Sequence, residues 1–414
     1  MKKVLIVSYY FPPIEVIAAK RFGTMCKYFE ENGYKPYVLT TKIDGNLGVD
    51  VGRKLELPID KKQIIQIGSD RTNGEIENIC AKSFVDILTH NKYISRTISA
   101  IEFGWYEKVK NNINLAELSE IDIIIATYPT MGALYIANYL SRKLECPYIV
   151  DIRDLISDYS ETEKGYKKIG LLDQIIEKYI LDKACGIVTV TPGFRDILKA
   201  RHPNKTFCVV FNGWDGQKKE VVNVSNENNE KYIYYAGSLY LHRLESCELL
   251  IKCIAKINDE KKERIKLIIR SIGPKKLDRK LRNIVQQNGM QEYVSVLGAA
   301  DERIVKKEQR NAYINVVLST IHEDDRALMT TVPAKVYELL ITQPPTLAIV
   351  PRCSDVGRIL HYTNKGMATV AEDEIIDFIQ KDCKRYTGNK NVNYFTRKRQ
   401  AERLCNFMNK VLEK

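Results

Sequence analysis

The sequence predicts an α/β protein with two doubly wound, Rossmann-like domains that face each other across a cleft. Short apolar runs alternate with amphipathic stretches of helical length, and this alternation stops at a polar segment and then restarts. The chain has 414 residues, enough for two or three domains of about 100–200 residues each. Ligands of such sheets bind at the carboxyl ends of the strands, so we expect the site in the cleft.

In the first half, runs rich in β-branched residues and leucine indicate strands that are buried on both faces of a parallel sheet. We predict strands at 4–7, 37–40, 121–126, 148–151, 186–190 and 207–211. A helical stretch follows the first strand to about Asn32, where Gly33 supplies a stop, and a second helix covers 133–144. These elements make residues 1–211 the first domain.

Residues 212–231 are polar and rich in turn formers, which is typical of a domain linker. The second domain then covers 232–390, with strands predicted at 232–236, 266–269, 294–297, 314–318 and 346–350. Helices are predicted near 245–257, 276–287, 304–310, 333–341 and 374–379. Within the last segment, 391–414, apolar Leu404, Phe407, Met408 and Val411 recur at helical spacing opposite a basic face.

Composition excludes several classes of protein. The residues are 44% hydrophobic and 28% charged, which is typical of a soluble globular chain. No apolar run approaches the ~18 residues that cross a bilayer, and the run after Met1 is too short for a signal peptide. We therefore predict a cytoplasmic protein. The ten cysteines are scattered without a C-x-x-C pair, so we expect reduced thiols and no zinc site.

The basic excess, 64 Lys and Arg minus 52 Asp and Glu or +12, predicts an anionic partner. No nucleic-acid-binding motif is present, which leaves a membrane surface or a phosphorylated substrate. The segment 8–15 after the first strand lacks G-x-G-x-x-G, and no P-loop motif occurs, which disfavours hydride transfer and P-loop chemistry. Without an Asp-x-Asp motif we expect neither a metal nor another cofactor.

Two cations of the second half are candidates for binding a diphosphate. Gly237 and Ser238 follow a predicted strand, where their backbone N–H groups and Arg243 could contact phosphate. Lys335 and Glu338 lie three residues apart on a predicted helix, so the ammonium could bind phosphate and the carboxylate could accept two ribose hydroxyls. The alternative interpretation is a solvated arginine and an ordinary surface Lys–Glu pair.

Five segments in this order resemble the GT-B glycosyltransferases of the family-4 type, especially bacterial members of polysaccharide and lipopolysaccharide assembly. The segments are Ser8-Tyr9-Tyr10-Phe11-Pro12-Pro13 with Arg21, Asp151-Ile152-Arg153-Asp154-Leu155, Asn212-Gly213-Trp214-Asp215, Gly237-Ser238-Leu239 with Arg243, and Pro333-Ala334-Lys335-Val336-Tyr337-Glu338. The resemblance covers nearly the whole chain, and each motif by itself is moderately specific.

The resemblance implies transfer of a sugar, with retention and without metal, from a UDP- or GDP-linked donor to a growing, lipid-linked glycan. It also implies that the first domain binds the acceptor, the second binds the donor, and the final helix crosses back to the first. Arg243, Lys335 and Asp154 would be the catalytic residues. The donor-binding residues would be Gly237, Ser238, Arg243, Gly273, Leu297, Thr330, Thr331, Lys335 and Glu338, and the acceptor-side residues would be Pro13, Arg21, Tyr128 and Asp151.

The sequence also departs from the family pattern. Thr330 stands where the first carboxylate of the family's E-x7-E motif is expected, and Glu15-Val16 replace a glycine pair. The segment 127–132 lacks a histidine that is often found in the acceptor-side loop. Asp151 and Asp154 could contact the sugar or acceptor instead, or they could belong to a salt-bridged strand end. Two alternative functions remain: a catalytically degenerate scaffold or partner subunit, and a nucleotide-sugar epimerase.

Two basic stretches indicate a peripheral contact at the inner face of the plasma membrane. The segment 82–112 mixes aromatic, aliphatic and basic residues, as an interfacial helix requires, although an ordinary helix packed on the sheet explains it as well. The run 384–403 has seven Lys or Arg against Glu402, a net +6, and could contact anionic lipid.

Overall fold

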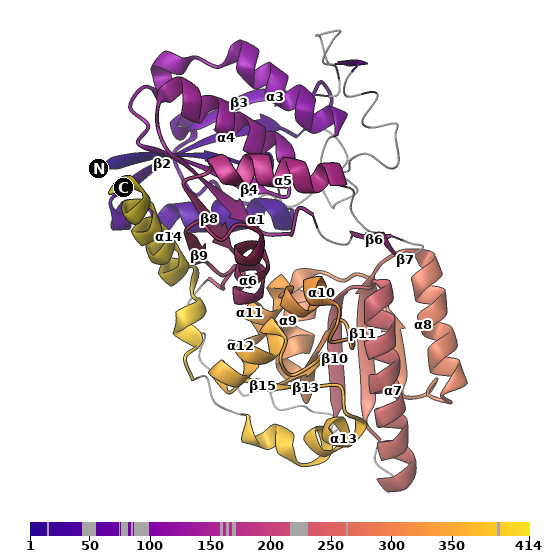
Figure 1. Cartoon of the computed structure of the whole chain (residues 1–414). Helices are drawn as coiled ribbons and strands as arrows, with labels where there is room; N and C mark the ends of the chain where they lie inside the picture. The colour runs from indigo at the N-terminus through magenta and orange to yellow at the C-terminus, as the bar shows by residue number, and fades with distance from the viewer. Residues whose placement is uncertain are drawn as a thin grey trace. The chain divides into compact units, whose positions relative to one another are not determined.

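A computed structural model describes the chain except for residues 15, 44–54, 74, 76–81, 84–85, 87–98, 158–159, 163–164, 168–170, 216–230, 262–263 and 387–389. The chain divides into two compact units, which we call the first unit (Met1–Asp215 with Thr396–Lys414) and the second unit (Gly216–Phe395). Each unit contains a parallel sheet with helices packed against it (Figure 1). The predicted fold class, two doubly wound α/β domains, is confirmed.

The described residues of the first unit form a seven-stranded parallel sheet in the order β3-β2-β1-β4-β5-β8-β9. Its strands are β1 (Lys2–Val7), β2 (Tyr34–Lys42), β3 (Ile64–Ser69), β4 (Ile123–Tyr128), β5 (Tyr148–Ile152), β8 (Gly186–Thr189) and β9 (Phe207–Val209). A small antiparallel pair joins β6 (Ser160–Thr162) and β7 (Gly165–Lys167). The strand order reverses between β1 and β4, which is the topological switch point where such sheets bind ligands.

Helices cover both faces of this sheet because its strands are apolar on both sides. Along β1, Leu5 and Val7 enter one core cluster while Val4 and Ile6 enter the other. The first cluster includes residues of α3 (Ala100–Asn112), α4 (Met131–Leu144), α5 (Leu171–Lys183) and α6 (Pro192–Arg201), and the second includes residues of α1 (Ile17–Met25) and α14 (Arg397–Leu412). The periodicity of the buried strands thus explains the layers of the unit.

The last helix, α14, belongs to the first unit although it is the final element of the chain (Figure 1). Leu404, Phe407, Met408 and Val411 are buried in the core cluster that contains α1, as their helical spacing predicts. Gln400 is fully buried and accepts a hydrogen bond from the backbone N–H of Phe211 at 2.9 Å. Apolar packing and this buried contact fix α14 on the sheet.

The second unit contains a six-stranded parallel sheet in the order β12-β11-β10-β13-β14-β15. Its strands are β10 (Tyr232–Ser238), β11 (Lys266–Ile272), β12 (Val294–Leu297), β13 (Ile314–Leu318), β14 (Thr346–Ile349) and β15 (Gly366–Thr369). The helices are α7 (Leu241–Lys261), α8 (Lys275–Gln287), α9 (Glu302–Asn311), α10 (Arg326–Thr330), α11 (Ala334–Leu339), α12 (Asp355–Thr363) and α13 (Glu372–Gln380). Here the order reverses between β10 and β13, which places this unit's switch point there.

Several predicted boundaries are wrong. The helix predicted to reach Asn32 ends at Met25 and continues as two short 3₁₀ helices, Cys26–Tyr28 and Glu30–Asn32, before Gly33 with its positive φ of 83°. The strand predicted over 207–211 ends at Val209, since the carbonyls of Val210 and Phe211 accept hydrogen bonds from Arg21 instead. The prediction also omitted β3, α5, α6, α12 and β15, whose apolar signals are short or interrupted.

For the segment 82–112, the described helix α3 packs on the sheet. Trp105 and Val109 are fully buried, and the indole N–H of Trp105 donates to the carbonyl of Ile67 at 3.1 Å. Residues 84–85 and 87–98 of this segment lie outside the described residues. In the part of the chain that the structure covers, no helix combines the length and the apolar character needed to cross a membrane. The cysteines described there are free thiols.

Candidate functional site

The candidate donor site lies at the carboxyl end of β10, next to the switch point of the second unit. β10 ends in Gly237 and Ser238, which pair with Ser271 and Ile272 at the end of β11. Gly237 has a φ of +155°, and a Cβ at this position would lie 3.1 Å from Nζ of Lys335. Glycine therefore permits both the backbone conformation and the close approach of a lysine side chain.

Lys335 reaches this strand end from α11. Its Nζ donates a hydrogen bond to the carbonyl of Ala236 at 3.1 Å and lies 3.7 Å from the centroid of the Tyr235 ring. The helix predicted near 333–341 is α11, which spans Ala334–Leu339 and has Pro333 as its N-cap. The short helix thus directs the ammonium toward β10, where a carbonyl and an aromatic face hold it.

Arg243 reaches the same strand end from the first turn of α7. Its Nη1 donates to the carbonyl of Ser238 at 2.6 Å, and its guanidinium lies 4.8 Å from the centroid of the Tyr240 ring. The buried Nε atom of Arg243 has no hydrogen-bond partner among the residues that the structure describes. A buried donor without a partner costs free energy, so this part of the site is suited to an additional acceptor.

The two basic side chains lie close together, and no acid in the described part of the chain compensates them. Burial and the positive charge of Arg243 hold the pKa of Lys335 well below its usual value. Among the described residues, no carboxylate forms an ion pair with either side chain. Two basic side chains without an acidic partner form an arrangement that favours a polyanionic ligand, since a bound anion would stabilise the charged form of both.

The other predicted donor residues occupy different positions around this end of the unit. Glu338 is exposed one turn beyond Lys335 on α11. Thr330 and Thr331 are half-buried, and both hydroxyls donate to the carbonyl of Ala327 in α10. These hydroxyl protons are used within the helix, so the threonines can offer a ligand only acceptor lone pairs.

Apolar side chains flank the two cations at the ends of the neighbouring strands. Ile272, at the end of β11, is 62% exposed, and Leu297, at the end of β12, is 36% exposed. Gly273 is exposed as well, and a Cβ there would lie 3.0 Å from the carbonyl oxygen of Leu239. Exposed aliphatic groups beside a cationic pair can cover the flat face of a nucleoside base.

In the first unit, Arg21 and Asp151 form a buried ion pair. Nε and Nη2 of Arg21 donate to the two carboxylate oxygens at 2.8 and 2.6 Å, and the side chains are 2% and 0% exposed. The hydroxyl of Thr127 donates to the same carboxylate at 2.9 Å. For Asp151, the structure therefore supports the salt-bridged strand end, one of the two interpretations of this segment.

The remaining acceptor-side residues lie around the carboxyl ends of β1, β4 and β5. Arg153 donates to the carbonyls of Tyr128 and Ala18, each at 2.9 Å, which links β4, β5 and α1. Asp154 is exposed immediately beyond this link, and Tyr128 is half-buried. Pro13 is exposed after β1, and its carbonyl accepts a hydrogen bond from Leu55 at 2.9 Å.

The Asn212-Gly213-Trp214-Asp215 segment is fixed to the first unit. The side chain of Asn212 accepts a hydrogen bond from Arg21 at 3.1 Å, and Trp214 is 4% exposed. Asp215 accepts from the hydroxyl of Tyr28 at 2.5 Å and pairs with Lys27. The segment therefore holds residues 212–215 on the first unit. Residues 216–230 of the predicted linker lie outside the described residues.

The sequence analysis missed Glu102, a half-buried residue of α3. Its Oε2 accepts hydrogen bonds from the backbone N–H groups of Met131 and Gly132 at 2.6 and 3.4 Å, at the start of α4. Burial raises the pKa of Glu102 to about 7. No local sequence signal points to this contact, because the partners are 29 and 30 residues apart.

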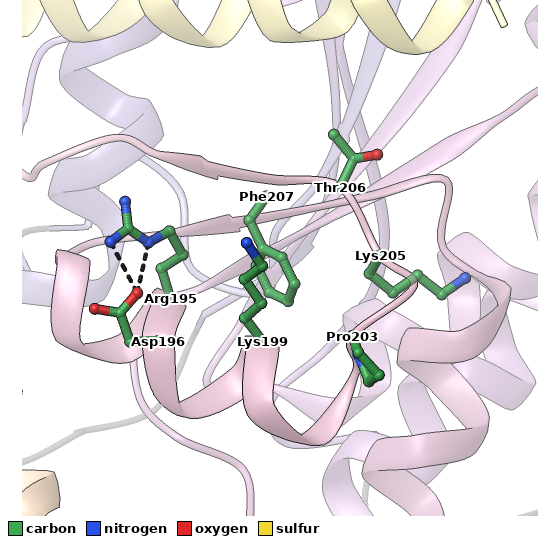
Figure 2. Close-up of a pocket in the computed structure, with 7 residues that line it drawn as sticks. All are labelled: Arg195, Asp196, Lys199, Pro203, Lys205, Thr206 and Phe207. Carbon is green, nitrogen blue, oxygen red and sulfur yellow. Dashed lines mark hydrogen bonds and ion pairs between the residues drawn. The ribbon is translucent and has the colours of Figure 1, made fainter.

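A pocket of the first unit is lined by Arg195, Asp196, Lys199, Pro203, Lys205, Thr206 and Phe207 (Figure 2). Arg195 forms an ion pair with Asp196 at 2.8 Å, and Lys205 donates to the carbonyl of Ala184 at 3.0 Å. Because these two cations already have protein partners, we assign the pocket no catalytic role. No group of three or more metal-binding side chains occurs among the described residues.

Comparisons with known proteins agree with the architecture. No protein-family model matches the chain, and no curated protein matches its sequence. HepE from Anabaena, solved with UDP and glucose, has 12% sequence identity and a TM-score of 0.62, and the match covers 99% of this chain and 100% of HepE. A variant of S. aureus TarM, solved with UDP, fondaparinux and α-GlcNAc-glycerol, has 11% identity and a TM-score of 0.62, with 99% and 100% covered.

An epimerase shares the architecture at a lower score. A protein from Listeria monocytogenes, described as a putative UDP-N-acetylglucosamine 2-epimerase, has 10% identity and a TM-score of 0.54. The match covers 100% of this chain and 97% of that protein. At identities this low the similarities establish the fold alone, and that fold is GT-B.

Proposed function

We propose that this chain is a glycosyltransferase that moves a sugar from a UDP- or GDP-linked donor to a growing, lipid-linked glycan. The observation that supports this most directly is the convergence of Arg243 and Lys335 on the end of β10, where no described acidic residue pairs with them. HepE and TarM, which share the fold, were both solved with UDP. This supports a nucleoside diphosphate as the ligand of the cationic pair.

In this proposal the donor's pyrophosphate binds to Arg243, Lys335 and the backbone N–H groups at Gly237 and Ser238. The two cations stabilise the negative charge that develops on the leaving diphosphate, which is electrostatic catalysis by groups already in position. Glu338 binds the ribose hydroxyls, and the exposed side chains of Ile272 and Leu297 cover the base. Transfer proceeds with retention, as the resemblance to family-4 enzymes implies. It needs no divalent metal, because side chains neutralise the diphosphate.

The acceptor binds to the first unit in this proposal. Asp154 is exposed at the carboxyl end of β5, where it can contact the transferred sugar or the acceptor. A lipid-linked acceptor would bring the protein into peripheral contact with the inner face of the plasma membrane. The basic run over 384–403 supports such a contact, although Lys398 and Arg399 in that run already pair with Glu31 and Glu402.

Two alternatives have specific support. Thr330 stands at the position where the family-4 pattern has its sugar-contacting Glu. The missing carboxylate favours a degenerate scaffold or partner subunit. The fold is shared with the Listeria protein described as a putative epimerase, so the architecture is compatible with a nucleotide-sugar epimerase as well. An epimerase would release free or epimerised sugar without an acceptor, whereas a scaffold would turn over no donor.

Binding and turnover of UDP- and GDP-sugars test the proposal. We expect UDP or GDP to bind in the presence of EDTA, and Arg243→Gln and Lys335→Met each to weaken binding at least about tenfold, or ~1.4 kcal/mol. Lys276→Met and Arg279→Gln remove exposed cations of α8 in the same unit and are the matched controls. Calorimetry measures the binding, and release of UDP or GDP from a panel of nucleotide sugars measures turnover.

The outcomes separate the three functions. Acceptor-dependent release of nucleotide supports the transferase, and acceptor-independent conversion of the donor supports the epimerase. Nucleotide binding without turnover of any donor supports the scaffold. If Arg243→Gln and Lys335→Met both bind UDP and GDP with unchanged affinity, the assignment of the donor site is wrong.

A further inference from the structure

One buried tyrosine, Tyr235, is linked to both basic side chains of the candidate donor site. It lies in β10 and is fully buried. Nζ of Lys335 lies 3.7 Å from the centroid of its ring, and its hydroxyl donates a hydrogen bond to the carbonyl of Ser238 at 2.9 Å. The same carbonyl accepts the hydrogen bond from Nη1 of Arg243 at 2.6 Å. Tyr235 therefore contacts Lys335 directly and is linked to Arg243 through a single oxygen atom.

The ring of Tyr235 attracts the ammonium without carrying a charge of its own. An aromatic face attracts a cation through its quadrupole, and this attraction is strongest where water is excluded. Burial and the charge of Arg243 both lower the pKa of Lys335, so both disfavour the protonated amine. The ring and the carbonyl of Ala236, 3.1 Å from Nζ, favour it. A carboxylate in this place would hold the ammonium too, but it would cancel the positive charge that a diphosphate needs.

The hydroxyl of Tyr235 fixes the carbonyl group that orients Arg243. A carbonyl oxygen has two lone pairs, and Tyr235 and Arg243 each donate to the oxygen of Ser238. Burial raises the pKa of Tyr235, and Arg243 opposes this rise because its guanidinium lies close to the phenol. Gly237 leaves room for both contacts, since a Cβ there would lie 3.1 Å from Nζ of Lys335 and 3.4 Å from the phenol oxygen.

Packing in the core explains the burial of Tyr235 but not these contacts. Tyr235 belongs to the core cluster of the second unit. The preceding residue, Tyr234, is buried as well, with its side chain on the other face of the sheet. The hydroxyl of Tyr234 donates to Glu308 at 2.8 Å, and Glu308 pairs with Arg270. Tyr234 therefore meets an acid and a base that neutralise each other, whereas Tyr235 meets two basic side chains that form no ion pair with any described carboxylate.

We propose that Tyr235 is a positioning residue of the donor site: its ring holds the ammonium of Lys335, and its hydroxyl holds the guanidinium of Arg243 through the Ser238 carbonyl. Two side chains of like charge are thereby kept together before any ligand binds. This inference rests on the proposed function, because it concerns the same donor site. A diphosphate then meets basic groups that are already in place, so binding does not have to overcome the cost of bringing them together.

Two substitutions separate the ring from the hydroxyl. Tyr235→Phe keeps the ring and removes the hydroxyl, so we expect it to weaken UDP binding about fivefold, the effect of one lost hydrogen bond. Tyr235→Leu removes the ring as well and should weaken binding at least about tenfold. Tyr234→Phe is the matched control, because it removes the buried hydroxyl on the other face of the sheet, and it should bind UDP like the unaltered chain. Calorimetry measures the affinities, and near-UV circular dichroism checks that each variant keeps its fold.

The titration of Lys335 in the ligand-free protein distinguishes positioning from packing. Without the ring the protonated amine loses an attraction, so Lys335 should titrate about one pH unit lower in Tyr235→Leu and change little in Tyr235→Phe. If Tyr235 only filled the core, its loss would admit water, and Lys335 would titrate at a higher pH instead. Carbon-13 NMR of the lysine side chains measures this titration, with the Lys335 resonance identified by its loss in Lys335→Met.

The two measurements separate this inference from the proposed function. Failure of UDP to bind the unaltered chain would overturn the proposed donor site, while the titration of Lys335 without ligand would still test the role of Tyr235. An unchanged or higher titration of Lys335 in Tyr235→Leu would overturn the inference. UDP binding of equal strength in Tyr235→Phe, Tyr235→Leu and the unaltered chain would overturn it as well.

Discussion

At the scale of single residues, the protonation of Lys335 depends on Arg243 beside it and on the charge of any bound ligand. In the free protein the two cations repel each other, and Lys335 is also partly desolvated. A bound diphosphate would reverse the sign of the local field and favour the protonated lysine. The affinity of the site must then depend on pH.

We predict that the affinity for UDP falls as the pH rises through the lowered pKa of Lys335. The bound diphosphate raises this pKa, so the complex holds more protons than the free protein between the two values, and binding takes up protons. Calorimetric titrations with UDP at a series of pH values above about 7 measure the effect. In this range the phosphate, whose second pKa is about 6, stays ionised, so its own charge does not change. Lys335→Arg should remove it, because arginine does not titrate, and a pH-independent affinity in the unaltered chain would contradict the prediction.

Glu102 leads to a second prediction at this scale, which concerns the pH dependence of the free energy of unfolding. Burial raises its pKa to about 7, from about 4.3 for an unfolded glutamate. A raised carboxyl pKa contributes stability that is complete below the unfolded value and is lost as the pH rises through the folded value. Glu102→Gln lacks this titration, so its free energy of unfolding should rise relative to the unaltered chain between about pH 4.5 and 7, by on the order of 2 kcal/mol.

Urea denaturation at a series of pH values and constant salt measures this difference. The control is Glu107→Gln on the same helix, whose difference from the unaltered chain should stay constant across the range. A difference for Glu102→Gln that does not change with pH would show that the carboxyl titrates normally.

At the scale of elements, the Arg21–Asp151 pair joins α1, β5 and the end of β9. Arg21 also donates to the carbonyls of Val210 and Phe211, so one guanidinium satisfies backbone groups just beyond an edge strand. A pair that is 2% and 0% exposed cannot be broken without leaving a buried charge. This contact therefore fixes the middle of α1 relative to the carboxyl ends of β5 and β9.

We predict that Asp151→Asn destabilises the first unit by about 3–5 kcal/mol, the usual cost of removing one partner of a buried ion pair. Asp154→Asn, three residues further along, changes an exposed carboxylate and should cost less than about 0.5 kcal/mol. Chemical denaturation of both variants measures the contrast. Equal stability of the two variants would mean that the buried pair does not hold these elements together.

The elements also differ in how far the sequence could predict them. β1 was predictable because its apolar run has no polar interruption, while β15, Gly-Met-Ala-Thr, has no such signal. Arg243 and Lys335 could be identified because each follows a local motif. The contact of Glu102 with Met131 and the ion pair of Arg21 with Asp151 could not be predicted. Their partners are 29 and 130 residues apart and meet only through the tertiary fold.

At the scale of the whole molecule, the same architecture occurs twice with different chemistry at the switch point. In the first unit, the Glu102 carboxylate binds the first amides of α4, whereas in the second unit two basic side chains, Arg243 and Lys335, meet at the end of β10. In the proposed function, only the basic pair of the second unit binds the charged donor, and the first unit binds the acceptor.

A crystal structure of the protein soaked with UDP or GDP in the presence of EDTA tests the central claim most directly. We predict the pyrophosphate at the carboxyl end of β10, with its oxygens within hydrogen-bonding distance of Arg243 and Lys335 and no divalent ion beside it. A nucleotide bound elsewhere on the chain, or one that enters this site only when magnesium is added, would contradict the account.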